Sequence, residues 1–398
     1  MLKVEMLSTG DEVLHGQIVD TNAAWLADYL FENGFPMTRR NTVGDNLDAL
    51  VAILQERSQQ ADVVIVNGGL GPTSDDLSAE AAAKAAGVGL ELHEDWLAHM
   101  AQFFTSRGRV MAPSNRKQAM IPAGSEMVDN PIGTACGFAM TLNRAWIFFT
   151  PGVPSEFRQM VEQQIVPRLR QRYPQVEPPV CLRLTTFGRS ESDLAQSLNA
   201  LALPPEVVMG YRSSMPIIEL KLTGPAKARE AMEALWPKVR EVAGESLIFE
   251  GTEGLPAQLA RRLHEKELRL SLSEQFTSGL LALQLRSAGA PLLDSEVLTD
   301  RDETLEETAQ RAAALVQKAG SELTLLVGAM QDEQVNVVLC TPVGLHAARL
   351  QFSASRHALR TRQEVCAMMA LTMLRRWLNE TPVTAEQGWV RVVEAFSQ

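Results

Sequence analysis

The most informative segment of the chain runs Val63-Val64-Ile65-Val66-Asn67-Gly68-Gly69-Leu70-Gly71-Pro72-Thr73-Ser74-Asp75-Asp76. Its four successive β-branched residues indicate a buried strand of a parallel sheet. Three glycines within four positions then allow a sharp turn that brings backbone N–H groups close to an anion. A helix predicted from Leu77 to Ala86 adds the partial positive charge of its N-terminus. The segment therefore predicts a phosphate-binding loop.

Two carboxylates, Asp75 and Asp76, close the same segment. They would repel a phosphate unless a cation lay between them, so metal-assisted phosphate chemistry is one interpretation. The other is a helix N-cap, where aspartate is favoured for capping and for the helix dipole. Short glycine-rich motifs also recur by chance, so the residues by themselves leave both interpretations open.

Length, charge and cysteine usage bound the class of protein. With 398 residues the chain exceeds one ordinary domain, and two or three are expected. A net charge of −11 argues against nucleic acid or an anionic membrane as a partner. The four cysteines lie far apart, so no zinc site or disulfide framework is predicted and a cytoplasmic location is expected. We expect no signal peptide, and no apolar run approaches the roughly 18–20 residues of a membrane span.

The order of the predicted elements indicates a layered amino-terminal domain. A strand at the start of the chain, a helix over Ala23–Glu32, a second helix over Leu47–Gln59 and the strand at Val63 alternate. This rhythm is typical of a parallel sheet with helices on both faces. Ligands of such sheets bind beyond the carboxyl ends of the strands, where Asp11, Asp45 and the glycine-rich loop are expected to gather.

Further polar segments follow later strands of this domain. They include a basic loop at Asn115, Arg116 and Lys117 and a turn at Gly133 and Thr134. Asn-Pro and Pro-Gly pairs mark turns whatever they bind, and a single arginine or lysine is usually solvated. The repeated placement of such segments after strands is what favours a common pocket.

Two proline- and glycine-rich stretches divide the rest of the chain. They predict domains at residues 1–173, 174–250 and 251–398. The middle region is expected to be a small α+β module of the KH type. Its loop Gly188-Arg189-Ser190-Glu191 lacks the Gly-x-x-Gly that clamps nucleic acid, which favours a spacer. The last region alternates strands and helices and closes with a helix over Leu359–Leu378, which predicts an α/β domain.

Seven segments in order make the chain resemble the CinA (competence/damage-inducible protein A) family over essentially its full length. They are Ser8-Thr9-Gly10-Asp11-Glu12, Gly16-Gln17-Ile18-Val19-Asp20-Thr21-Asn22, Thr42-Val43-Gly44-Asp45-Asn46, Gly68-Gly69-Leu70-Gly71-Pro72-Thr73-Ser74-Asp75-Asp76-Leu77, Asn115-Arg116-Lys117-Gln118-Ala119, Pro131-Ile132-Gly133-Thr134-Ala135 and Pro151-Gly152-Val153-Pro154-Ser155-Glu156. The resemblance implies a molybdopterin-binding fold for the first domain and a homodimer. It also implies a metal-dependent pyrophosphatase that splits ADP-ribose or a related nucleoside diphosphate sugar.

The resemblance also assigns roles to individual residues. The expected catalytic acids are Asp75 and Asp76, and a divalent metal, Mg²⁺ or Co²⁺, is expected on Asp11, Glu12 and Asp76. The expected substrate-binding residues are Gly68, Gly69, Gly71, Thr73, Asn115, Arg116, Lys117, Gly133 and Thr134. His15 departs from the usual apolar residue, and packing is a more common role for an isolated histidine than metal binding. An alternative class is a protein that binds a nucleotide or pterin phosphate without turning it over.

The carboxy-terminal domain departs from the family. Members with nicotinamide-nucleotide deamidase activity carry Ala-Glu-Ser-Cys-Thr-Gly-Gly with a nucleophilic serine, and Gln275 stands at the serine position here. An amide is neither nucleophile nor general base. The family tyrosine is missing, since no tyrosine follows Tyr211, and Lys318 belongs to another predicted helix. We therefore expect a folded but inactive deamidase domain that serves oligomerisation or regulation; the alternative is an active nicotinamide mononucleotide deamidase.

Overall fold

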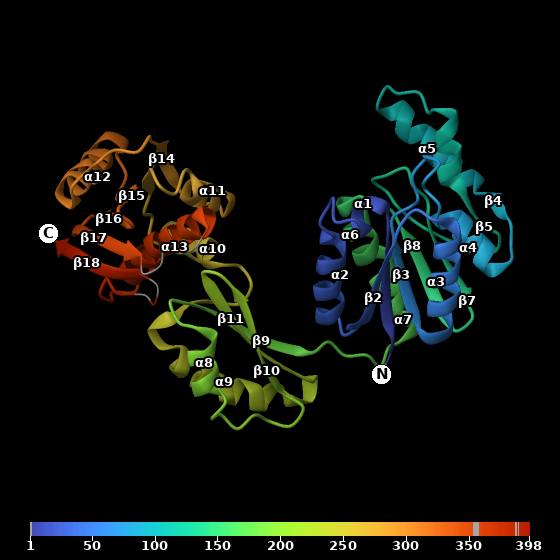
Figure 1. Ribbon diagram of the computed structural model, residues 1–398, viewed down its shortest axis with the longest axis horizontal. Coiled ribbons are helices and arrows are strands. Elements are labelled where there is room, and N and C mark those ends of the chain that lie inside the picture. The colour runs from blue at the N-terminus through green and yellow to red at the C-terminus, as the bar shows by residue number, and fades with distance from the viewer. Residues whose placement is uncertain (1, 353–357, 387, 389) are drawn as a thin grey trace. The chain divides into compact units, whose positions relative to one another are not determined.

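The structure is a computed structural model that describes residues 2–352, 358–386, 388 and 390–398. It divides into two compact units, Met1–Pro179 and Val180–Gln398. The first unit is built on one six-stranded sheet, and the second holds a four-stranded and a six-stranded sheet (Figure 1). Within the described residues, no helix combines the length and the apolar character that crossing a bilayer requires.

The sheet of the amino-terminal unit has the strand order β2-β1-β3-β8-β7-β6. The first four strands run parallel, because a helical crossover connects each parallel pair, and the last two are antiparallel. The strands are β1 (Val4–Thr9), β2 (Met37–Val43), β3 (Val63–Asn67), β6 (Glu126–Val128), β7 (Gly137–Leu142) and β8 (Ala145–Thr150).

Helices cover both faces of this sheet (Figure 1). One face packs under α2 and the continuous helical stretch α6–η2–α7, and the other packs under α3 and α4. The helices are α1 (Asp11–Leu14), α2 (Thr21–Glu32), α3 (Leu47–Gln60), α4 (Ser78–Ala86), α6 (Pro154–Met160), the π-helical turn η2 (Val161–Ile165) and α7 (Val166–Arg172). All five residues of β3 are buried, as expected for a strand covered on both faces. The α/β fold class predicted from the sequence is confirmed.

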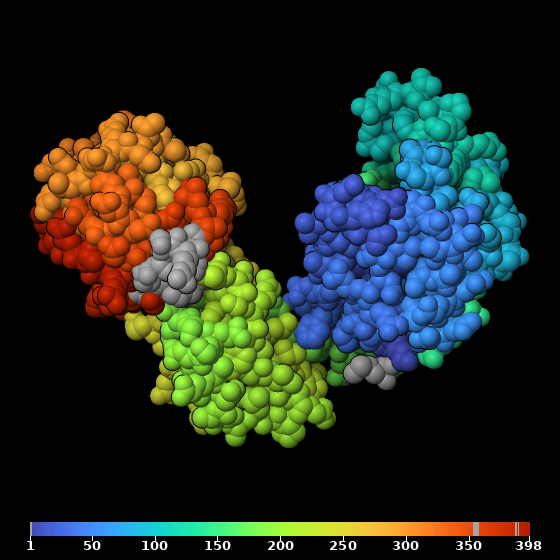
Figure 2. Space-filling model, in the orientation of Figure 1, coloured from blue at the N-terminus to red at the C-terminus, as the bar shows by residue number. Residues whose placement is uncertain are grey.

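One part of this unit escaped the sequence analysis. Helix α5 (Glu94–Ser106) forms a lobe that projects from the sheet domain (Figures 1 and 2). It anchors through Trp96 and Met100, which are buried. The flanking elements are the small sheet of β4 (Leu90–Leu92) and β5 (Met120–Pro122) and the 3-10 helix η1 (Pro113–Ala119). The basic loop predicted at residues 115–117 is therefore helical.

The first sheet of the carboxy-terminal unit is antiparallel, in the order β10-β11-β9-β12. Helices α8 and α9 pack on one face of it around a core that includes Leu194, Leu220 and Trp236. This is the α+β module expected from the sequence. Its elements are β9 (Val180–Phe187), α8 (Glu191–Leu198), β10 (Val208–Ser214), β11 (Ile217–Gly224), η3 (Ala226–Ala228), α9 (Arg229–Ala243), η4 (Gly244–Ser246) and β12 (Leu247–Glu250).

The second sheet of this unit has the order β14-β13-β15-β16-β17-β18. Its first three strands are parallel and the others antiparallel. The strands are β13 (Leu270–Glu274), β14 (Leu292–Val297), β15 (Leu323–Gln331), β16 (Gln334–Thr341), β17 (Gly344–Phe352) and β18 (Val390–Ser397). Strand β15 runs past Gly328 to Gln331, and β16 pairs with it antiparallel.

Helices again cover both faces of this sheet (Figure 1). One face packs against α10 (Leu255–Glu265), α11 (Leu280–Ser287) and α13 (Leu359–Leu378), and the other against α12 (Leu305–Ala319). Phe187 and Ile248 of the antiparallel sheet belong to the same core as α10 and α13, so the two sheets share buried surface. The boundary predicted between residues 250 and 251 lies inside this unit and stays a prediction.

Candidate functional site

A pocket of about 500 Å³ lies where β1, β3 and β8 of the amino-terminal unit end. This is the edge at which parallel sheets bind ligands. Residues expected from the sequence that line it are Glu12, Gly68, Gly69, Gly71, Asp75, Asp76 and Thr134. Those that do not are Asp11, Thr73, Asn115, Arg116, Lys117 and Gly133. The pocket thus gathers the loop and its acids, and leaves the basic residues outside its wall.

The glycine-rich loop owes its shape to Gly68 and Gly69. Both have left-handed backbones, with φ of +107° and +70°. A Cβ on Gly68 would lie 2.6 Å from the Thr9 hydroxyl, and one on Gly69 would lie 2.3 Å from the Ser78 hydroxyl. The loop therefore packs tightly against β1 and the start of α4. Glycine is required here by sterics, which accounts for the pattern whether or not a phosphate binds.

Asp76 turns back onto its own loop. Its carboxylate accepts a hydrogen bond from the Thr73 backbone N–H at 2.8 Å and another from the Thr73 hydroxyl. Helix α4 begins at Ser78 with Leu77 as its cap, so neither Asp75 nor Asp76 is the N-cap that the sequence allowed. The Thr73 hydroxyl also holds the pKa of Asp75 below its usual range, with the positive charge of Lys117 contributing.

Asp11 and Asp45 are joined by two hydrogen bonds between backbone N–H groups and side-chain carboxylates. The Asp11 N–H donates to the Asp45 carboxylate and the Asp45 N–H to the Asp11 carboxylate, both at 3.1 Å. Burial raises the pKa of Asp45, and repulsion from Asp11, Glu12 and Asp75 raises it further, whereas the hydrogen bond from Asp11 lowers it. Among the described residues, no three histidine, cysteine or acidic side chains converge as ligands of one ion. The acids do not form a ligand set as they stand, so the divalent metal stays a prediction.

The basic segment has structural contacts of its own. Asn115 accepts from the Ala112 N–H at 3.1 Å and donates to Gln118 at 2.9 Å, so it closes the 3-10 helix η1. Lys117 donates to the Thr73 carbonyl and thereby ties η1 to the glycine-rich loop. Arg116 is exposed. Of the three, Lys117 contacts the glycine-rich loop, and none of them lines this pocket.

Gly133 and Thr134 occupy different positions. Gly133 packs so closely on Glu156 that a Cβ would lie 2.1 Å from its carboxylate. The Thr134 hydroxyl donates to Gln118 at 3.2 Å, and Thr134 faces the pocket. Gly133 therefore serves packing, and Thr134 is available to a ligand.

The sequence analysis missed two asparagines in the pocket wall, Asn22 and Asn67. The Asn22 amide nitrogen donates to Asn67 at 3.0 Å and to the Gly152 carbonyl at 2.9 Å. With both of its donors in use, the Asn22 side-chain oxygen is buried and has no partner among the described residues. Asn22 ends one of the segments shared with the family, and that was the available signal. Its free acceptor fits a ligand that carries an N–H group.

The carboxy-terminal unit holds a second polar site at the end of β13. Glu274 is fully buried and accepts from the Thr277 hydroxyl at 2.7 Å. It also accepts the first free N–H groups of α11, from Leu281 at 3.0 Å and Ala282 at 2.8 Å. A carboxylate at a helix N-terminus satisfies unpaired donors and complements the helix dipole. Glu274 therefore fixes the turn between β13 and α11.

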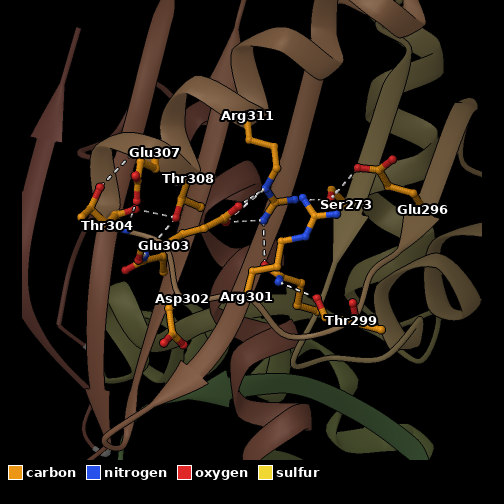
Figure 3. A network of polar contacts seen from close by, with 12 residues as sticks. Ser273, Glu296, Thr299, Arg301, Asp302, Glu303, Thr304, Glu307, Thr308 and Arg311 are labelled. Atoms are coloured by element: carbon orange, nitrogen blue, oxygen red, sulfur yellow. Dashed lines mark hydrogen bonds and ion pairs between the residues drawn. The ribbon is translucent and has the colours of Figure 1, made fainter.

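Gln275, the next residue, belongs to a network around Arg311. Figure 3 shows Arg311 of this network together with Glu303 and Ser273. The guanidinium donates to Gln275 at 2.7 Å, to the Ser273 hydroxyl at 2.7 Å and to both oxygens of Glu303. The Gln275 amide donates in turn to the Thr299 carbonyl at 3.0 Å. The side chain that replaces the family's serine is thus held on both sides by charged and polar groups.

Ser273 extends this network towards Lys318. The Ser273 hydroxyl donates to Glu296 at 3.0 Å, and the Lys318 ammonium lies 3.9 Å from the same carboxylate. The sequence analysis set Lys318 aside because it lies in another helix. The fold brings its charge to the site, although the side chain is largely exposed.

A pocket of about 390 Å³ borders the network, between the start of α12 and strands β15 to β17. It is lined by Arg301, Asp302, Glu303, Thr304, Glu307, Thr308, Ala329, Gln331, Asp332, Gln334, Asn336 and Arg349. Glu303 is shared between this pocket and the Arg311 network (Figure 3). The side chain of Arg301 makes no hydrogen bond or ion pair with any described residue. The pocket thus combines Arg301, whose side chain has no partner among the described residues, with several carboxylates.

The chain is similar to known proteins, both within its amino-terminal unit and along its whole length. Residues 5–171 match the family model described as "Probable molybdopterin binding domain". The whole chain is 66% identical over 397 residues to a CinA-like protein of Escherichia coli O9:H4 (strain HS), covering 99% of that relative. It is equally identical, with the same coverage, to the NMN amidohydrolase-like protein YfaY of Escherichia coli (strain K12). A solved structure, the protein CinA of Thermoplasma acidophilum, is 32% identical with a TM-score of 0.38, over 40% of this chain and 94% of that one.

These comparisons contradict two expectations drawn from the sequence. The main activity expected was an ADP-ribose pyrophosphatase, but a relative that matches the entire chain is named for similarity to an NMN amidohydrolase. The same name contradicts the expectation of an inactive deamidase domain. That expectation rested on Gln275, on the missing tyrosine and on Lys318, which was set aside as part of another helix. It did not foresee that Arg311, Glu303 and Lys318 fold into the surroundings of Gln275 and keep the site charged.

Proposed function

Because the chain belongs to the CinA-like family, we propose that its carboxy-terminal unit hydrolyses the carboxamide of nicotinamide mononucleotide. The observation that supports this proposal is the 66% identity, along the entire chain, to the relative named NMN amidohydrolase-like protein YfaY. The reaction consumes one water, breaks the amide C–N bond, and releases ammonia and nicotinic acid mononucleotide. We also propose a cytoplasmic location, which the four free cysteines support.

The pocket beside the Arg311 network offers groups suited to this reaction. Arg301 supplies a guanidinium for the phosphate of the nucleotide, because its own side chain has no partner among the described residues. Asp302 supplies a carboxylate that can take a proton from an attacking water. Since Gln275 stands where the family places its serine nucleophile, we assign the attack to water.

Ammonia release from nicotinamide mononucleotide by the purified full-length protein tests this proposal. We expect ammonia and nicotinic acid mononucleotide in equal amounts. Asp302→Asn should abolish turnover and Arg301→Gln should raise KM, whereas Asp300→Asn, an exposed neighbour outside the pocket, should leave both unchanged. Absence of ammonia above the protein-free blank would refute the assignment.

A second candidate function belongs to the amino-terminal unit, and the unpaired acceptor of Asn22 favours it. We propose that the pocket at the glycine-rich loop binds a phosphorylated pterin or nucleotide. The loop would hold the phosphate through backbone N–H groups, and Asn22 would accept from an N–H of the ring. The family model described as a molybdopterin-binding domain supports a pterin.

Calorimetric titration with a phosphorylated pterin and with AMP tests this second candidate. We expect saturable binding of at least one of them by the full-length protein. Asn22→Ala should weaken that binding because the acceptor is lost. Failure of both ligands to bind would exclude this function and would leave the amidohydrolase proposal untouched.

A further inference from the structure

A smaller pocket of about 230 Å³ opens in the carboxy-terminal unit, where β12 meets α10 and the end of α13. It lies apart from the pocket beside the Arg311 network, and the two share no lining residue. Its polar lining consists of Glu250, Gln258, Arg262, Arg375 and Asn379, and its apolar lining of Leu247, Ile248, Phe249, Leu255 and Leu259. The lining thus combines two arginines with several apolar side chains.

The positive charge of this pocket lacks anionic partners. Arg262 donates to the Asn379 side-chain oxygen and to the Leu378 carbonyl, both at 2.6 Å, and both acceptors are neutral. The side chain of Arg375 forms no hydrogen bond or ion pair with any described residue. Its Nε is buried and unsatisfied. Such a group costs free energy unless something else binds it.

Nearby carboxylates are already committed. Glu250 lies 2.7 Å from Arg240, and Glu245 lies 2.9 Å from Arg376. Burial lowers the pKa of Arg375, and the charge of Arg376 lowers it further. Arg262 acts in the same direction, whereas Glu245 raises the pKa of Arg375. The net result is two half-buried guanidinium groups, of Arg262 and Arg375, that form no ion pair with a described carboxylate.

Helix capping does not account for all of this charge. Arginines in the last turn of a helix often bind its free carbonyl groups and complement its dipole. Arg262 does so at Leu378, and Arg376 does so indirectly by donating to the Pro382 carbonyl beyond the end of α13. Arg375 makes no such contact. Among the described residues, neither helix capping nor ion pairing therefore accounts for Arg375.

We propose that this pocket binds a small ligand in which a phosphate monoester is attached to an apolar body. The guanidinium groups of Arg262 and Arg375 would hold the phosphate, since arginine matches its geometry with paired donors. Leu247, Phe249 and Leu259 would cover the apolar body. The ligand would touch β12 of one sheet and α10 and α13 of the other, so its binding would tie the two sheets together. This proposal is independent of the proposed amidohydrolase activity.

Calorimetric titration of the full-length protein with phenyl phosphate tests the site. We expect saturable binding that is at least tenfold weaker in Arg375→Met, which keeps the length of the side chain but removes its charge. Arg261→Met is the matched control, because Arg261 lies on α10 beside Arg262, is exposed and pairs with Glu253 outside the pocket. Since the amino-terminal pocket is also a proposed phosphate site, the loss in Arg375→Met identifies the site. Equal affinity in wild type and Arg375→Met would overturn the proposal.

Two further measurements separate ligand binding from a structural role. In phosphate-free buffer, Arg375→Met should melt at or above the wild-type temperature, because repulsion from Arg376 and Arg262 is relieved. A lower melting temperature would show that Arg375 stabilises the empty fold and would overturn the proposal. Inorganic phosphate should bind more weakly than phenyl phosphate, and equal affinity would contradict the role given to the apolar wall.

Discussion

Replacing Arg311 with methionine should destabilise the carboxy-terminal unit strongly. The guanidinium binds Glu303, Gln275 and Ser273 at once, and it therefore joins α12, the end of β13 and the segment before α12 (Figure 3). Methionine keeps much of the side-chain volume and removes every donor. The carboxylate of Glu303 is then left without its cation.

The expected magnitude follows from the burial of the ion pair. Breaking a fully buried pair by removing one partner costs about 3–5 kcal/mol, because the remaining charge stays buried. The side chains of Arg311 and Glu303 are 16% and 15% exposed, so water can still reach Glu303. We therefore expect the lower end of the range, about 3 kcal/mol, as the loss in free energy of unfolding.

Urea denaturation of the full-length protein, followed by circular dichroism, measures this loss. The second arm of the experiment is Glu303→Gln, alone and combined with Arg311→Met. In the double variant no buried charge is left without a partner. Its loss in free energy of unfolding should therefore be smaller than the sum of the two single losses, by about 1–2 kcal/mol. Additive losses, within about 0.5 kcal/mol, would refute the claim that the two groups act as a pair.

Three other variants test separate features. Gly71→Ala should cost about 1–2 kcal/mol in urea denaturation, because its Cβ would lie 2.4 Å from the Asp76 carboxylate; an unchanged stability would contradict this packing. Arg269 holds the pKa of Glu322 at about 2, below the unfolded value near 4.3, so the pair stabilises at neutral pH and is lost as the pH falls from about 4 to 2. Glu322→Gln should thus cost at most about 1 kcal/mol at pH 7 and much less at pH 2, where the carboxyl is partly protonated, measured by thermal melts at both values. Leu371→Ala should cost about 3 kcal/mol, since Leu371 is fully buried on α13, and a loss below about 1 kcal/mol would contradict that burial.

Much of the fold followed from local patterns. The four β-branched residues at Val63 gave a strand buried on both faces, and helix α13 was predicted with its observed bounds, Leu359–Leu378. The prediction that this helix closes the region was wrong, because strand β18 follows it. Helix α5 was missed because only Trp96 and Met100 of its residues are buried, so its apolar stripe is narrow. Strand β15 continues past Gly328, which interrupts its apolar pattern, because β16 pairs with it as far as Gln331.

The sites were harder to predict because they depend on contacts between distant segments. The glycine-rich loop was located correctly by its own residues, since the turn is a local property. Asn22 reaches the loop through Asn67, 45 positions away. Arg311 reaches Gln275 across 36 positions. No local sequence pattern predicts a contact between residues so far apart in the chain. The presence of Gln275 in place of the family serine was therefore given too much weight, because the charged groups around it could not be predicted.

Strand β18 has a consequence for aggregation. Without it, the edge of β17 that it covers would present unpaired N–H and C=O groups from His346 to Phe352. Open edges of this kind recruit strands from other chains. A variant that ends before Val390 would leave this edge of β17 open. We expect such a variant to form inclusion bodies to a greater extent than the chain that contains β18.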